Sequence, residues 1–163
     1  MLRYASYDIV FQEIPDEITL AINISNCPNR CTGCHSPNLQ KDTGEELTKS
    51  VLSDLLNIYG NAVTCICFMG GDSSPEELLN LAKFVRQYTI TAAVDTQSVA
   101  FRYKTAWYSG NSQLYENAQH HFDYIKLGKY IEQLGGLNSP TTNQRFYRIE
   151  RTTMIDITEQ FYK

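Results

Sequence analysis

Three cysteines lie close together in the first quarter of the chain. Cys27, Cys31 and Cys34 have the spacing C-x3-C-x2-C, and no fourth cysteine lies nearby. Thiolates bind zinc and iron–sulfur clusters, but three are one too few for a closed tetrahedral zinc site or a fully ligated iron–sulfur cube. A four-iron cluster held by three thiolates keeps one iron without a protein ligand. Because that iron can bind a small molecule, the motif indicates a catalytic cluster.

Zinc remains an alternative at this point. His35 follows Cys34 directly and is a candidate fourth ligand, although two adjacent residues rarely both reach one tetrahedral metal. Disulfides are not expected, because the five cysteines are an odd number and the N-terminus does not read as a secretory signal. Cys65 and Cys67 lie two apart in an apolar segment, and we interpret them as small buried side chains rather than ligands.

The segments around the cysteines predict how they are positioned. Residues 17–25 are rich in β-branched side chains and predict a strand. Pro28 and Gly33 then favour a loop, which can fold three sulfurs around one object. The loop leaves the C-terminal end of this strand, where active sites of parallel α/β folds usually lie. We expect backbone N–H groups of residues 29–33 to donate to the sulfurs.

Two further strand ends carry candidate ligand contacts. Gly70 and Gly71 follow an apolar strand predicted at 62–69, and two glycines allow a ligand to approach the backbone closely. Asp72 adds a carboxylate able to hold a cationic group, although Gly-Gly-Asp is also common in turns. Asp95 and Thr96 end another predicted strand, where they are interpreted either as polar contacts to the ligand or as a helix cap or turn.

Helix and strand patterns alternate along the chain. We expect one helix over 48–59, with Thr48 as its N-cap and Gly60 as its end, and a second helix starting at Ser74. Further strands are predicted at 7–11, 89–94, 105–108, 122–127 and, as an edge strand, 144–149, with a helical segment at 115–121 and a loop-rich region from residue 135. This order predicts an α/β fold: one domain over residues 1–163, forming an open, partial (β/α) barrel with a mostly parallel, curved sheet.

Composition excludes several functional classes. The chain carries a net charge of −4 and no basic run, so we expect no nucleic-acid partner. No apolar stretch approaches the length of a membrane span, and we expect no membrane partner. A cytoplasmic, reducing compartment follows as the expected location, and it suits thiolate ligands.

Five motifs together resemble a known family. The cysteine motif and Gly70-Gly71-Asp72 resemble those of radical S-adenosylmethionine enzymes. The likeness sharpens to the anaerobic ribonucleoside-triphosphate reductase activating proteins through Trp107-Tyr108-Ser109-Gly110, Gly128-Lys129-Tyr130 and Thr142-Asn143-Gln144-Arg145. The chain departs from the family pattern at residues 13–16, which replace a Gly-Pro-Gly-like turn. Two serines also separate Asp72 from Pro75, and a Trp often found soon after the cysteines is absent.

The resemblance implies a site and a reaction. Cys27, Cys31 and Cys34 would hold a [4Fe-4S] cluster whose open iron binds the amino and carboxylate groups of S-adenosylmethionine. The residues expected near this cofactor are Gly33, Cys34, His35, Gly70, Gly71, Asp72 and Asp95. Reductive cleavage would produce a 5′-deoxyadenosyl radical, which takes a hydrogen from a glycine of the anaerobic reductase large subunit. A low-potential donor such as flavodoxin or ferredoxin would supply the electron.

Two alternatives to this reaction stay open. A radical S-adenosylmethionine enzyme of this kind can act on another glycyl-radical enzyme or on a small molecule. A second class is a non-catalytic zinc or iron–sulfur binding module.

Overall fold

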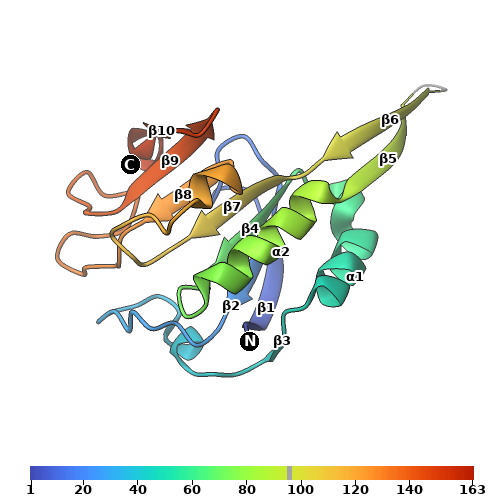
Figure 1. The fold of residues 1–163 in the computed structure, drawn as a ribbon. Coiled ribbons are helices and arrows are strands. Elements are labelled where there is room, and N and C mark those ends of the chain that lie inside the picture. Colours follow the sequence, from blue (N-terminus) through green and yellow to red (C-terminus); the bar gives the residue numbers. More distant parts are fainter. Residues whose placement is uncertain (95–96) are drawn as a thin grey trace.

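An eight-stranded sheet forms the centre of the protein (Figure 1). We analysed a computed structural model, which describes residues 1–94 and 97–163. The strands of the sheet follow the order β10-β9-β8-β7-β4-β2-β1-β3. Their bounds are β1 Arg3–Val10, β2 Thr19–Ile24, β3 Glu45–Glu46, β4 Cys65–Met69, β7 Lys104–Tyr108, β8 Tyr124–Leu127, β9 Arg145–Glu150 and β10 Thr153–Asp156.

The four central strands are parallel and the outer strands are antiparallel. The pairs β2–β4, β4–β7 and β7–β8 are parallel, whereas β1–β2, β1–β3, β8–β9 and β9–β10 are antiparallel. The prediction of a mostly parallel, partial (β/α) barrel is therefore wrong. Parallel strands are usually joined by a helical crossover. Here the irregular segment 109–123 joins β7 to β8, and β8, β9 and β10 follow one another as an antiparallel meander.

Two α-helices occur in the described residues, where the sequence predicts them. The helix α1, Lys49–Tyr59, begins at Thr48, whose side chain accepts a hydrogen bond from the Val51 N–H, and Gly60 stands at its C-cap. The helix α2, Pro75–Gln87, begins with proline and two glutamates, although the Ser74 side chain makes no capping hydrogen bond. Short 3-10 turns occupy Pro37–Gln40, Gly60–Ala62, Ala118–His120 and Thr158–Phe161.

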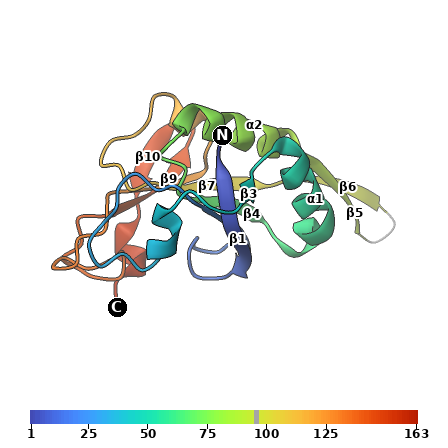
Figure 2. The same ribbon diagram turned by 90° about the horizontal axis from the view of Figure 1, so that it is seen from below.

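The two faces of the sheet are covered differently (Figure 2). Both helices lie on one face, over a core that includes Ile66, Phe68 and Trp107. Because successive side chains of a strand point to opposite faces, Cys65 and Cys67 lie on the other face. There they form a smaller buried cluster with the loop after β1 and the C-terminal segment.

Three predicted elements differ from the structure. The strand at 89–94 is β5, Thr89–Val94, but it pairs only with β6, Gln97–Arg102, in a hairpin that projects from the sheet (Figure 1). The predicted helix at 115–121 is only a 3-10 turn, because Asn117 adopts a left-handed conformation with φ of 65°. The strand at 144–149 is not an edge, since β10 pairs beyond it through a turn with positive φ at Arg151 and Thr152.

In the part of the chain that the structure describes, no helix combines the length and the apolar character needed to cross a membrane.

Candidate iron–sulfur site

The cysteine loop follows β2 and is closed by backbone hydrogen bonds. The N–H groups of Asn26 and Cys27 donate to the carbonyls of Lys41 and Leu39, at 3.0 Å and 2.9 Å. This pairing returns the chain to its starting point, so that the three cysteines project from one compact loop. The loop is irregular, as predicted, with positive φ at Asn26, Arg30 and Gly33.

All three cysteines line one cavity of about 190 Å³ at the C-terminal ends of the parallel strands. Each of the three is partly exposed. Opposite them lie Met69 and Gly70 from the end of β4 and Tyr108 from the end of β7. The parallel centre of the sheet thus brings the strand ends together beneath the cysteine loop, which is the arrangement that the sequence predicts.

Among the described residues, one cysteine of the loop accepts a hydrogen bond from a backbone N–H group at its sulfur. The Ser36 N–H donates to the Cys34 Sγ at 3.4 Å. The donors expected from residues 29–33 are not found there in the described structure. A donor from Ser36 still places a positive partial charge beside a sulfur, the kind of contact that surrounds metal-binding thiolates.

The two glycines after β4 have different roles. Gly70 lines the cavity, and its carbonyl accepts a hydrogen bond from the Trp107 indole at 2.9 Å. Gly71 instead faces the core, because a Cβ on it would lie 3.1 Å from the Leu78 methyl groups and 3.4 Å from Ile24 Cδ1. With φ of +97°, Gly71 is required by backbone conformation and core packing.

The Asp72 carboxylate lines the cavity, but protein donors already occupy it. It accepts hydrogen bonds from the Asn29 side chain at 2.8 Å, the Gly110 N–H at 2.7 Å and the Ser109 hydroxyl at 2.6 Å. The carboxylate therefore joins the turn after β4 to the cysteine loop and to the end of β7.

Two other predicted contacts lie beside the cavity rather than on its wall. His35 is exposed, and its ring packs edge-on against Tyr130 with 5.0 Å between ring centroids. A Cβ on Gly33 would meet the Glu132 carboxyl group at 3.1 Å. Asp95, with Thr96, lies outside the described residues. The ligand contacts of these residues stay predictions.

Lys126 is the main site residue that the sequence analysis missed. It lies in β8, is only 8% exposed, and its ammonium donates to the carbonyls of Ser109 and Gly128. Burial lowers the pKa of this ammonium to about 8, although the nearby Asp72 carboxylate and the three cysteine thiolates oppose the shift. The sequence does contain a signal for this residue, because Lys126 stands inside an apolar predicted strand. Lysine is rarely fully buried without a partner.

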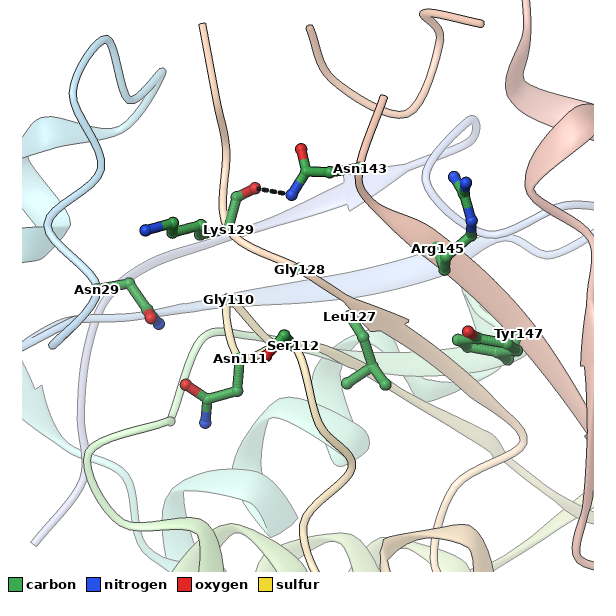
Figure 3. A pocket seen from close by; sticks show the side chains of 10 residues that line it. All are labelled: Asn29, Gly110, Asn111, Ser112, Leu127, Gly128, Lys129, Asn143, Arg145 and Tyr147. Carbon is green, nitrogen blue, oxygen red and sulfur yellow. Dashed lines mark hydrogen bonds between the residues drawn. The ribbon is translucent and has the colours of Figure 1, made fainter. Parts of the chain in front are cut away.

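A second cavity of about 440 Å³ adjoins the first (Figure 3). The two cavities share Asn29, Gly110 and Lys129. Its lining residues are Asn29, Gly110, Asn111, Ser112, Leu127, Gly128, Lys129, Asn143, Arg145 and Tyr147. None of these is acidic and two are cationic, so this cavity suits a polar or anionic ligand.

The second cavity also joins two motifs that are separate in the sequence. Asn143 lies in the segment 142–145 and Lys129 in the segment 128–130. The Asn143 side-chain amide donates to the Lys129 carbonyl at 3.0 Å, and the Arg145 guanidinium is held by the carbonyls of Thr142 and Gln144.

Cys65 and Cys67 are fully buried on the face of the sheet away from the helices, in a cluster against which Met69 and Tyr108 pack. Burial raises the pKa of both thiols well above the usual value, which disfavours the thiolate form that binds metals. Among the described residues, no three His, Cys, Asp or Glu side chains lie close enough together to hold a single metal ion. In a four-iron cluster, by contrast, each thiolate binds a different iron.

The residues of the first cavity fit a cluster. Three thiolates from one loop face a space with a buried cation that offsets negative charge, which is the donor set that iron–sulfur clusters use.

Comparison with known proteins agrees with this donor set. The family model of the 4Fe-4S single cluster domain matches residues 18–137, which include the three cysteines, the glycine pair and Lys126. No curated protein and no solved structure matches the chain. Since the match spans well over half of the sequence, the chain belongs to the 4Fe-4S single cluster domain family.

Proposed function

We propose that this protein is a glycyl-radical activating enzyme that cleaves S-adenosylmethionine. One observation carries the proposal: Cys27, Cys31 and Cys34 share a cavity with the buried Lys126 at the ends of the parallel strands. Three thiolates leave one iron of a four-iron cluster open to a ligand. An electron carrier needs no such position, whereas an enzyme that binds its substrate to the cluster does.

The protein's own residues supply binding and charge. Each of the three thiolates would hold one iron, and the Ser36 N–H would stay bonded to the Cys34 sulfur. The Lys126 ammonium would provide a positive charge in the cavity that the three cysteines line, where it would attract the carboxylate of S-adenosylmethionine. Gly70 lets this amino-acid part approach the backbone, because it has no side chain.

The second cavity extends the site toward the rest of the ligand. It shares three lining residues with the first, so a ligand seated at the cluster reaches it directly. When bound, the cluster supplies one electron to the sulfonium of S-adenosylmethionine, whose C5′–S bond breaks to give methionine and a 5′-deoxyadenosyl radical. The lining amides and Tyr147 would then hold the adenosine part in place.

The proposed substrate is a glycine of the anaerobic ribonucleoside-triphosphate reductase large subunit. Its Cα–H hydrogen passes to the 5′-deoxyadenosyl radical, which leaves 5′-deoxyadenosine and a glycyl radical. Support comes from the segments 128–130 and 142–145, which resemble that family of activators and lie together at the second cavity. The partly exposed cysteines are accessible to a protein partner and to a low-potential donor such as flavodoxin or ferredoxin.

The test is to mix the reduced, cluster-loaded protein with S-adenosylmethionine and the candidate reductase in the absence of oxygen. We expect a glycyl radical signal on the reductase by electron paramagnetic resonance, together with 5′-deoxyadenosine. A Cys31→Ala variant is the control and should give neither product.

Two results would redirect the assignment. Cleavage of S-adenosylmethionine without a radical on the reductase would leave a radical enzyme with another glycyl-radical partner or a small-molecule substrate. A loaded cluster that neither binds nor cleaves S-adenosylmethionine would point to a non-catalytic iron–sulfur module.

A further inference from the structure

One carboxylate connects three segments at the cluster site. Asp72 Oδ2 accepts hydrogen bonds from Asn29 Nδ2 at 2.8 Å and from the Gly110 N–H at 2.7 Å, and Asp72 Oδ1 accepts one from Ser109 Oγ at 2.6 Å. Asn29 lies between Cys27 and Cys31, whereas Ser109 and Gly110 follow the central strand β7. The irregular cysteine loop is thus tied to the centre of the sheet.

The loop needs such an external contact. Asn26 and Arg30 adopt positive φ values of 59° and 45°. Asparagine tolerates this conformation, but in arginine it costs energy. A strained loop keeps its conformation only when contacts outside the loop hold it. The Asn29 amide is the group through which Asp72 reaches this segment.

Gly110 provides the space for that amide. A Cβ on Gly110 would lie 2.4 Å from Asn29 Nδ2 and 2.8 Å from Asn29 Cγ, which is closer than atoms can approach. Gly110 does not have a left-handed φ, so its backbone conformation does not require glycine. Its lack of a side chain instead leaves room for the Asn29 amide.

We propose that Asp72 is a positioning residue for the cysteine loop and not a contact of the ligand. Through Asn29, it holds the segment between Cys27 and Cys31 in the conformation that receives the cluster. The role differs from the cofactor contact implied by the resemblance. It requires the iron–sulfur cluster alone, so it is independent of the S-adenosylmethionine chemistry proposed above.

The first experiment removes either end of the contact. Asn29→Ala should make loss of the reconstituted cluster to a chelator about tenfold faster, as expected when one charge-assisted hydrogen bond is lost. Asp72→Ala removes the acceptor of three hydrogen bonds and should accelerate the loss at least as much. The double variant should be no worse than Asp72→Ala alone, because both changes remove the same connection. Iron and sulfide content and the electron paramagnetic resonance signal of the reduced cluster are the readouts.

A matched control separates this role from general stability. Asp123 also accepts two hydrogen bonds, from Arg86 and from the Thr105 N–H, at the opposite ends of β7 and β8. Asp123→Ala should lower the thermal stability but leave the rate of cluster loss unchanged. In metal-free Asn29→Ala, amide hydrogen exchange should increase in residues 27–34 and stay unchanged in the central strands.

Two further variants test the mechanism of the contact. Gly110→Ala should accelerate cluster loss in the wild-type background but add nothing to Asn29→Ala, where the clashing amide is absent. Asp72→Asn should retain the cluster, because its amide oxygen can accept from Asn29 and Gly110 while its NH₂ donates to Ser109.

The proposal is overturned if Asp72→Ala and Asn29→Ala hold the cluster as tightly as the wild type. It is also overturned if Asp72→Asn keeps the cluster but binds S-adenosylmethionine more weakly, since the negative charge would then act on the ligand.

Discussion

At the scale of single residues, the site contains a lysine that is buried, although lysine side chains are usually exposed. Lys126 is a cation in an almost fully buried position, held by two carbonyl oxygens and surrounded by negative groups of the site. Such a group is costly unless a negative partner offsets its charge. Its position beside the cysteines therefore fits a site that holds an anionic iron–sulfur cluster.

The lowered pKa of Lys126 predicts a pH dependence of stability. Unfolding restores a pKa near 10.5 from about 8, so the unfolded chain binds more protons between these pH values. The free energy of unfolding of the cluster-free protein should therefore rise with pH from about 8 to 10.5, relative to Lys126→Met. Chemical denaturation of both proteins across this range is the measurement. A constant difference between them would show that Lys126 does not titrate in this way.

Gly71 allows a second prediction at this scale. Gly71→Val should destabilise the protein by about 2 kcal/mol or more, because it combines a positive φ with a clash against Leu78. Gly136→Ala is the matched control and should be nearly neutral, since its Cβ would meet nothing closer than 3.9 Å. Thermal unfolding of the cluster-free proteins measures both changes. If Gly71→Val instead left the stability unchanged and weakened S-adenosylmethionine binding, Gly71 would be a ligand contact.

At the scale of elements, local capping signals identify both helices, but they act differently. Thr48 caps α1 by accepting the Val51 N–H at 3.2 Å. At the start of α2, proline and two glutamates suit the helix N-terminus without a side-chain cap from Ser74.

The two helix starts predict different effects of alanine. Thr48→Ala should lower the free energy of unfolding by about 1 kcal/mol, because the Val51 N–H loses its acceptor. Ser74→Ala should cost less than half of that, since the Ser74 side chain makes no capping hydrogen bond. Urea denaturation of both variants is the measurement, and equal losses would contradict the difference in capping.

At the scale of the whole molecule, the fold separates two sets of cysteines along the strands. The three cysteines of the loop lie at the C-terminal ends of the parallel strands, whereas Cys65 and Cys67 are buried within β4, on the face of the sheet away from the helices. Cluster chemistry is confined to one end of the sheet, and the second pair serves packing.

This separation predicts which cysteines hold iron. Alanine at Cys27, Cys31 or Cys34 should abolish stable loading of about four irons per chain. Alanine at Cys65 or Cys67 should leave loading intact and lower the stability by about 1 kcal/mol through a small cavity. Iron analysis after anaerobic reconstitution, with thermal unfolding, measures both effects. Loss of the cluster in Cys65→Ala would contradict the separation.

The local features of this protein could be predicted from its sequence. Three cysteines within eight residues indicate one metal site, because ligands on a short loop stay close together whatever the rest of the fold is. Thr48, Pro75 and the apolar periodicity likewise predict both helices, since capping and amphipathicity act within a few residues.

How these elements pack together could not be predicted from local patterns. Strand direction depends on the connections between strands, and no local pattern distinguishes the meander β8–β9–β10 from parallel strands. The turn at Arg151 and Thr152 uses positive φ without glycine or asparagine, so its sequence gave no hairpin signal. The partners of Asp72 and the burial of Lys126 arise where β4, β7 and β8 end side by side, and the hydrogen bond from Asn29 to Asp72 joins residues 43 positions apart in the chain. Long-range contacts of this kind complete the site, and they exist only after folding.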